Sequence, residues 1–194
     1  MPHLLDHRRL FVRERVAVIK LTDTYDLLDP ETKAVIGIAQ EKVSGLVKFM
    51  RLLIDKSLMP TRVEIAAGEN QPPMLVIKRN AGLFRKKVTV FDGNGVQLGF
   101  FKSKILSIGG GFYVYSPDGQ QFADVKGDWK GWNFKFLDSA GKEMGLVTKK
   151  WAGLGKELFT SADNYIVEIK DGTSNNALLL AAAIAIDTVL KERK

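Results

Sequence analysis

The sequence predicts a mainly β protein with one central helix: a closed antiparallel β-barrel of repeated hairpins around a buried hydrophobic C-terminal helix. Three observations lead to this prediction. Short strand-like runs dominate the 194 residues, a turn pattern recurs between them, and the C-terminal part holds an apolar run without a polar face. A chain of this length suits one domain. We therefore expect a single domain over residues 1–194, with residues 1–10 as a loosely ordered N-terminal arm.

The strand-like runs are rich in β-branched and aromatic residues, and several alternate with a period of two. Gly, Asp, Asn or Pro bounds them. They read VAVIKLTDTYDLLDP, PMLVIKR, KKVTVFD, GFYVYSPDG, NFKFLDSAG and NYIVEIK. This composition and spacing indicate short β-strands.

A repeated pattern joins several of these runs into hairpins. An Asp or Ser is followed three residues later by Gly and, four further on, by a small residue. The three copies are Asp92/Gly95/Gly99, Ser116/Gly119/Ala123 and Asp138/Gly141/Gly145, and YDLLDPETKAVIGIA is a looser copy. The first Gly suits a turn because it adopts positive φ, and the later small residue predicts a bulge or bend in the returning strand. Hairpins at regular spacing favour a barrel or sandwich.

Two segments depart from the β pattern, and the first is EKVSGLVKFMRLLIDKSL at residues 41–58. Its apolar residues recur at helical spacing, with basic residues mostly between them. This pattern predicts an amphipathic helix.

The second is the apolar run from Ala177 to Ile186, followed by Asp187. As a helix, residues 177–190 measure about 21 Å, against roughly 30 Å for the hydrocarbon core of a bilayer. Alanine also contributes little to membrane insertion. A helix that is apolar on every side and spans no membrane must be buried on every side. We therefore expect a helix threaded through the barrel and no transmembrane span.

Composition narrows the possible partners and the compartment. The net charge of +7 favours anionic partners, namely lipid headgroups, nucleic acid or acidic proteins. The absence of cysteine excludes disulfides, thiolate metal sites and cysteine nucleophiles. The N-terminal residues are charged throughout and lack the apolar region of a secretory signal. We expect a cytoplasmic protein that lies peripherally at the inner face of the membrane.

The motifs that would indicate catalysis or cofactor binding do not match. GLGKE at Gly153–Glu157 lacks the preceding Gly and the following Ser or Thr of a phosphate loop. GNGVQLG leads into a strand rather than a helix. His3 and His7 are two candidate metal ligands on a terminal segment, too few for a site. We expect no cofactor, no metal and no enzymatic activity.

Basic and aromatic residues interleave in FRKKVTVF, GFFKSK, GDWKGWNFKF and KKW. Such mixtures suit anionic membrane surfaces, and they also suit single-stranded nucleic acid. Alternation along a strand is the other explanation, because it would place the aromatic rings inside and the lysines outside. The two later stretches predict a lipid-binding patch made of Lys126, Trp129, Lys130, Trp132, Lys149, Lys150 and Trp151.

The stretch KKWAGLGKELFTSADNYIVEI, followed by the apolar helix and Asp187, resembles the end of the phospholipid scramblase family. The matching residues are Lys149, Trp151, Gly153, Glu157, Phe159, Thr160, Ala162, Asp163, Asn164 and Tyr165. The resemblance implies the tubby C-terminal-like, LURP-one-related fold, which is a closed barrel around a hydrophobic helix. It also implies a part in phospholipid scrambling at a membrane.

The chain departs from that family at its proposed calcium segment. Ser161 stands where the family has an acid, and Gly172 stands where the closing acid would be, with Asp171 one residue early. Calcium needs several oxygen ligands, so we expect no effect of calcium on stability. The chain also lacks the family's proline-rich arm and cysteine cluster.

These observations favour a scramblase-related, non-catalytic domain that binds anionic phospholipid at a membrane surface and assists scrambling. Two alternatives stay open. One is a nucleic-acid-binding module that uses the same basic and aromatic surface. The other is an enzyme with a carboxylate site that no motif identifies.

Overall fold

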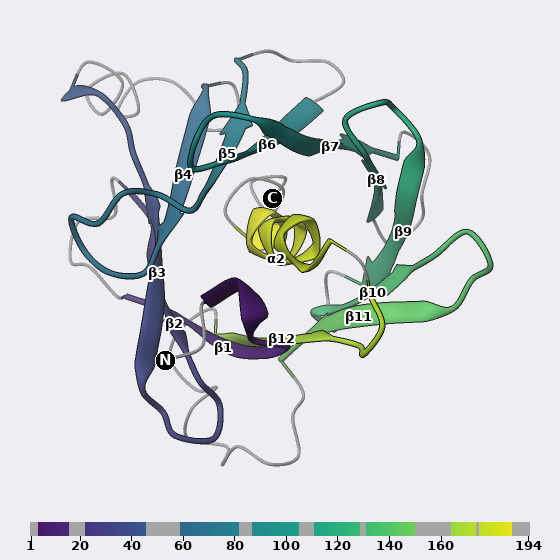
Figure 1. The fold of residues 1–194 in the computed structure, drawn as a ribbon, viewed down its shortest axis with the longest axis horizontal. Coiled ribbons are helices and arrows are strands. Elements are labelled where there is room, and N and C mark those ends of the chain that lie inside the picture. Colours follow the sequence, from purple (N-terminus) through teal and green to yellow (C-terminus); the bar gives the residue numbers. More distant parts are fainter. Residues whose placement is uncertain are drawn as a thin grey trace.

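The protein folds as a closed antiparallel β-barrel around one helix, as predicted (Figure 1). The computed structural model describes residues 4–15, 22–45, 59–81, 87–104, 111–128, 131–149, 164–173 and 175–187. Within them lie twelve strands, which follow one another around the barrel in chain order. They are β1 (Arg9–Glu14), β2 (Thr24–Leu28), β3 (Val35–Glu41), β4 (Thr61–Ala66), β5 (Leu75–Arg79), β6 (Lys87–Asp92), β7 (Gln97–Ser103), β8 (Gly111–Tyr115), β9 (Gln121–Asp128), β10 (Asn133–Leu137), β11 (Glu143–Thr148) and β12 (Tyr165–Ile169).

The first and last strands close the barrel. β1 pairs with β2 on one side and with β12 on the other, where Leu10 lies opposite Val167. Along the strands, side chains alternate between the two faces of the sheet. The inward ones form one apolar core, and the outward ones include charged residues such as Lys87 and Lys102. A closed barrel leaves no unpaired sheet edge.

Helix α2 (Asn176–Ala185) occupies the centre of the barrel (Figure 1). Every residue from Leu178 to Ile186 is at most 2% exposed. The Asn175 side chain caps the helix by accepting a hydrogen bond from Leu178 N at 3.2 Å. The prediction from the apolar run is confirmed, and none of the described helices is long and apolar enough to cross a membrane.

The repeated turn pattern forms the predicted hairpins. Gly95, Gly119 and Gly141 have φ between 79° and 90°, a region that glycine adopts without strain. Asp92 Oδ1 accepts hydrogen bonds from the main-chain nitrogens of the next turn residues at 2.8–2.9 Å, and Asp138 Oδ1 does the same. The looser copy is the β2–β3 hairpin, in which Asp29 plays this part.

The later small residue of each repeat follows a bulge. The β6–β7 register shifts so that Val90 lies opposite Gly99 and Phe91 opposite Gln97. A Cβ on Gly99 would lie 2.4 Å from Tyr115 O and 2.9 Å from the δ carbons of Leu178, which is on α2. The small residue is therefore required by the close approach of a neighbouring strand and of the central helix.

The two ends of the barrel differ. Because the strands alternate in direction, the tight hairpins β2–β3, β6–β7, β8–β9 and β10–β11 all lie at one end. Seven of the eight buried polar or charged residues lie at the other end, which we call the polar end. They are Glu14, Glu41, Thr61, Arg79, Thr148, Asn164 and Asp187. Helix α2 starts at the hairpin end and finishes at the polar end.

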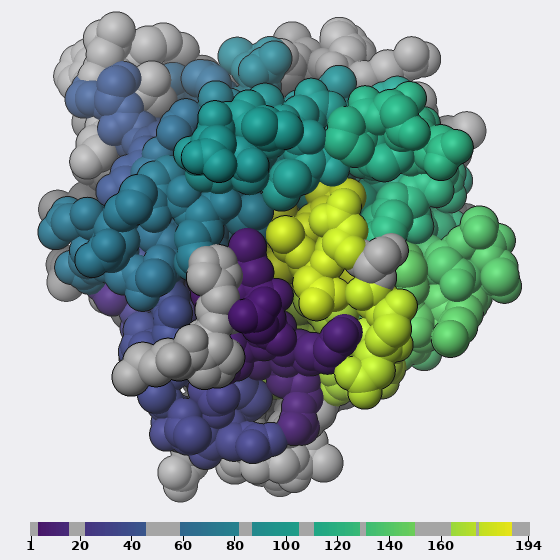
Figure 2. Space-filling model, viewed as in Figure 1, coloured from purple at the N-terminus to yellow at the C-terminus, as the bar shows by residue number. Residues whose placement is uncertain are grey.

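Two predictions concern segments that the structure describes only in part. Within 41–58, Glu41 ends β3, and residues 46–58, where most of the amphipathic helix is predicted, lie outside the described residues. Within residues 1–10, Leu4–Asp6 forms a short 3-10 helix, η1, and β1 begins at Arg9. Leu4 is buried, and Figure 2 shows the N-terminal segment in purple beside α2 in yellow.

The substitution Ala182→Arg should prevent folding. Ala182 lies on α2 and is fully buried inside the barrel. An unpaired charge there would cost several kcal/mol or more. This cost is comparable to the whole stability of a domain. Circular dichroism and size-exclusion chromatography would report the loss of soluble, folded protein. Val96→Arg, at a residue 60% exposed in the β6–β7 turn, is the matched control. Folded Ala182→Arg protein would contradict the central position of the helix.

Candidate functional site

The predicted lipid-binding residues fall in three different settings. Lys126 on β9 is 64% exposed and lies 3.8 Å from Asp124. Trp132, just before β10, is buried, and Lys149, just after β11, is half-buried with its Nζ 4.8 Å from the centre of the Trp132 ring. Trp129, Lys130, Lys150 and Trp151 lie outside the described residues. The structure thus brings Trp132 and Lys149 together, and the patch as a whole stays a prediction.

Trp132 belongs to the core. It is 6% exposed, and its ring packs edge-on against Phe134 at 5.7 Å and against Tyr165 at 6.1 Å between ring centres. The basic and aromatic stretches of the sequence have two explanations, and the second places the aromatic rings inside the barrel. The Trp132 ring lies inside, as that second explanation predicts. The Lys149 ammonium group lies over the Trp132 ring, and the ring itself is buried.

A second basic and aromatic surface lies on the outer wall of β5–β8, and we call it the cation–aromatic face. It consists of Lys78, Lys87, Phe91, Phe100, Lys102, Lys104, Tyr113 and Tyr115. Strand alternation turns these side chains outward, while their neighbours Ile77, Val88 and Phe101 fill the barrel. Strand pairing then brings Phe100 opposite Tyr115 and Lys102 opposite Tyr113.

The lysines of this face lie over aromatic rings. Lys87 Nζ is 4.2 Å from the centre of the Phe100 ring, and Lys102 Nζ is 5.2 Å from the same centre and 5.1 Å from that of Tyr115. Phe100 and Tyr115 stack at 5.0 Å with 13° between their planes. These distances fall within the range of cation–π contacts, which are worth about 0.5–1 kcal/mol at exposed sites.

Like charges lie directly opposite one another on this wall. Lys87 pairs with Lys102 across β6–β7, and Arg62 pairs with Lys78 across β4–β5. Such pairs destabilise a sheet. On β9, which pairs with β8 of this face, Lys126 also faces Lys135 of β10. There Asp124 and Glu143 provide opposite charge, as Glu64 does for Arg62.

The cation–aromatic face holds positive charge in excess. In the described part of the chain, Lys78, Lys87 and Lys102 are exposed and have no carboxylate within salt-bridge distance. By contrast, Arg13 and Arg15 share Asp26, and Lys170 lies beside Glu168. In the described part of the chain, this face therefore carries positive charge that no carboxylate neutralises.

The sequence contains a signal for this face that the predicted site did not use. FRKKVTVF and GFFKSK interleave basic and aromatic residues, and a period of two places Lys87 with Phe91 and Phe100 with Lys102. The sequence alone does not give the register between strands, which decides that Lys87 lies opposite Lys102.

Inside the polar end, Asp187 lies at the end of α2 among other titratable groups. The pKa of Asp187 is raised from 3.8 to about 7, mainly by burial and additionally by Glu14 and Asp23, while Tyr25 and Lys149 oppose the rise. Burial likewise raises the pKa of Tyr25 and lowers the pKa of Lys149. Two residues beyond the end of α2, the polar end therefore holds a carboxyl whose charge is disfavoured.

Metal ligands do not gather in the part of the chain that the structure describes. No group of three or more His, Asp or Glu there could hold a metal ion. His7 Nδ1 lies 3.7 Å from Asp29, and Asn164 Oδ1 accepts a hydrogen bond from Glu14 N at 3.1 Å. His3 and Asp163 lie outside the described residues.

Comparison with known proteins identifies the family. A family model described as Scramblase matches residues 71–193, well over half of the chain. The chain belongs to the Scramblase family. No curated protein and no solved structure matches it. The matched residues include β5–β12 and α2, and with them the whole cation–aromatic face of this scramblase-family barrel.

The substitution Trp132→Ala should destabilise the protein by about 3–5 kcal/mol, as is usual when a buried aromatic side chain is truncated. Urea denaturation would measure the change, with Val96→Ala at an exposed position as the control. If Trp132 instead served at a membrane, the variant would keep its stability and lose vesicle binding.

The substitution Asp187→Asn should stabilise the protein at neutral pH. Folding raises the pKa of Asp187, so between about pH 4 and about pH 7 the carboxyl is ionised in the unfolded state and still protonated in the folded state. The free energy of unfolding therefore falls as pH rises from about 4 to about 7. The penalty at higher pH is at most about 4 kcal/mol. Asparagine removes it, and the melting temperatures of variant and parent should converge below pH 4.

The control for this experiment is Asp171→Asn, because that carboxyl is 97% exposed. If the difference in melting temperature between Asp187→Asn and the parent did not change with pH, this result would contradict the interpretation that the charge of Asp187 is buried and disfavoured.

Proposed function

We propose that this scramblase-family domain binds anionic phospholipid at a membrane surface through its cation–aromatic face. The observation that carries the proposal is the set of exposed lysines, 78, 87 and 102, which lie on aromatic rings without a carboxylate partner in the described part of the chain. Each lysine near an anionic bilayer contributes about 1 kcal/mol of attraction. Aromatic side chains suit the headgroup level of a bilayer.

Such binding also explains why like charges stand opposite one another. The pair Lys87–Lys102 weakens the sheet by itself, and in the pair Arg62–Lys78 the charge of Arg62 is met by Glu64 while Lys78 has no carboxylate partner in the described part of the chain. Lipid phosphates between or above them would convert the repulsion into attraction. The proposed role is non-catalytic: the domain docks at the membrane and so assists movement of phospholipid between leaflets.

A peripheral position at the cytoplasmic face of the membrane is part of the same proposal. The cytoplasmic leaflet carries the anionic lipids that attract basic surfaces, and the net charge of the protein is +7. Binding of this kind needs no spanning segment, because surface charge and shallow aromatic contacts supply it.

The nucleic-acid alternative fits the face less well. Bases bind single-strand proteins by stacking on open ring faces. Here lysine ammonium groups lie over Phe91 and Phe100, and Phe100 is only 7% exposed. The positive charge would still attract phosphates, so the two partners need to be compared directly.

The triple variant Lys78→Gln, Lys87→Gln, Lys102→Gln should lose most binding to vesicles that contain phosphatidylserine. At about 1 kcal/mol per lysine the loss is roughly 100-fold. Sedimentation with liposomes would measure it. Binding of the parent protein should also fall as salt is raised, because exposed charges are screened over about 10 Å at 0.1 M. Binding to purely neutral vesicles should be weak for both proteins.

The matched control is Lys33→Gln, Lys135→Gln, Lys142→Gln, which changes the net charge equally at exposed positions elsewhere. An equal loss in this control would mean that total charge decides binding. Tighter retention of single-stranded DNA than of anionic vesicles at the same salt would favour the nucleic-acid alternative.

A further inference from the structure

One uncharged polar residue, Thr89, lies in the middle of the cation–aromatic face. On β6 it stands between Lys87 and Phe91, and all three turn outward because side chains alternate along a strand. Strand pairing places it directly opposite Lys78 on β5 and opposite Phe100 on β7. Thr89 is half-buried, and in the described part of the chain its side-chain hydroxyl takes part in no hydrogen bond. A hydroxyl donor is therefore available among the lysines.

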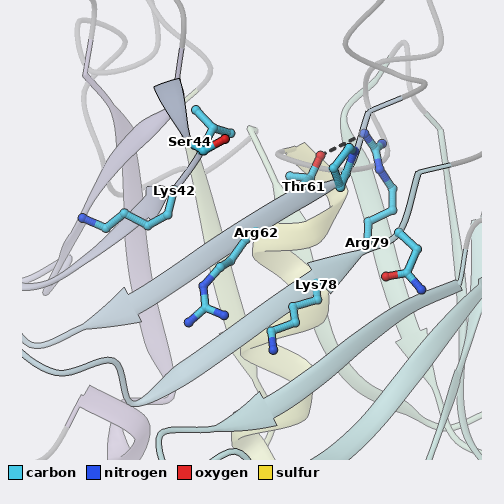
Figure 3. A pocket seen from close by; sticks show the side chains of 9 residues that line it. Lys42, Ser44, Thr61, Arg62, Lys78 and Arg79 are labelled. Atoms are coloured by element: carbon cyan, nitrogen blue, oxygen red, sulfur yellow. Dashed lines mark hydrogen bonds between the residues drawn. The ribbon is translucent and has the colours of Figure 1, made fainter. Parts of the chain in front are cut away.

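Lys78 reaches this face from β5. Figure 3 shows its side chain pointing outward beside that of Arg62, whereas Arg79, the next residue of β5, turns inward and donates to Thr61. Residues directly opposite in an antiparallel sheet have Cβ atoms about 4.5–5.5 Å apart, so the Lys78 side chain starts close to Thr89. Its ammonium group lies 4.7 Å from the centre of the aromatic ring that follows Thr89 on the outer side of β6. Lys78 therefore places positive charge on one side of the hydroxyl.

Lys87 and Lys102 place positive charge on the other side. They lie directly opposite each other on β6 and β7. Their Nζ atoms are 4.2 Å and 5.2 Å from the centre of the same ring, that of Phe100, which is the residue opposite Thr89. Both lysines are exposed, and neither has a carboxylate within salt-bridge distance in the described part of the chain. The two ammonium groups thus converge on the space above Phe100, next to the Thr89 hydroxyl.

The floor of this space is apolar. Phe100 is 7% exposed and stacks on Tyr115 with 5.0 Å between the ring centres. Rings of this size exclude water from one side of the donors. Charge-assisted hydrogen bonds are the strongest class, and they gain further strength where the local dielectric is low.

We propose that Thr89, Lys87 and Lys102 form a site for a single phosphate group, with Lys78 adding attraction from the other side. A phosphate is anionic and has several acceptor oxygens, so it can accept from one hydroxyl and two ammonium groups at once. As a lipid site it rests on the proposed function and deepens it, because the lipid is held at one position by a hydrogen bond as well as by charge. A free phosphate ion has the same chemistry, and vesicles and inorganic phosphate distinguish the two sources.

The substitution Thr89→Val removes the hydroxyl and leaves the net charge unchanged. Valine keeps the β-branched shape, so the melting temperature should stay the same. Binding to vesicles that contain phosphatidylserine should weaken roughly tenfold, which is the effect of one hydrogen bond to a charged group. The factor should be the same at every salt concentration, because no charge is lost. Thr89→Ser, which retains the hydroxyl, should bind like the parent, and so should the matched control Thr24→Val, at a half-buried position on β2.

A double-mutant cycle tests whether the donors hold the same phosphate. In a Lys102→Gln background, Thr89→Val should weaken binding by about threefold at most, because the phosphate is already less firmly positioned. In a Lys135→Gln background, with the charge removed on β10 instead, it should keep its roughly tenfold effect. Equal effects in the two backgrounds would overturn the shared site.

Inorganic phosphate, compared with chloride at equal ionic strength, should raise the melting temperature of the parent more than that of Thr89→Val. If it does so and no vesicle binds the parent, the site takes free phosphate and the proposed membrane function fails. If vesicles bind the parent and Thr89→Val equally, the phosphate site is overturned while membrane binding stands. If neither phosphate nor vesicles bind, both proposals are wrong. Thr89→Ala replaces Thr89→Val if that protein does not fold.

Discussion

The whole architecture depends on a helix that has no polar side. Residues Leu178 to Ile186 cannot face water anywhere around the helix without exposing apolar surface, so the fold must surround them. A two-layer sandwich covers a helix on one or two sides, whereas a closed barrel covers it on all sides. The small residues on the strands follow from the same constraint, since Gly99 leaves room for Leu178 and for the neighbouring strand.

Helix α2, with its alanines, fills the interior of the barrel together with the inward side chains of the strands. This apolar filling also determines which side chains the outer wall can carry. With two inward positions on most strands occupied by apolar side chains, the outward positions are available for charge. On β1, β2 and β12 these charges pair with one another, as in Arg13 with Asp26. On β5–β7 they do not, and lysines contact rings instead. The asymmetry gives the barrel one side that differs electrostatically from the rest.

The sequence predicts the barrel well because its signals are local. The turn triplets with Gly95, Gly119 and Gly141 specify hairpins within a few residues, and the length and composition of the C-terminal run specify burial. The surface is harder to predict because it depends on contacts between strands. Lys126 and Trp132 lie close in sequence in a basic and aromatic stretch, yet one is an exposed residue near a carboxylate and the other is core. Which lysine meets which ring depends on the registers of four strands, and no local pattern contains that information.

The order of the strands has a consequence for how the protein reaches this structure. β1 completes its pairing only when β12 is available, and the helix that fills the interior follows β12 in the chain. The contact that closes the barrel therefore joins residues about 155 positions apart, such as Leu10 and Val167. Long-range closure of this kind makes folding slow. During synthesis the growing sheet would have unpaired edges and no interior until β12 and α2 emerge, so the nascent chain depends on protection against aggregation until α2 is enclosed.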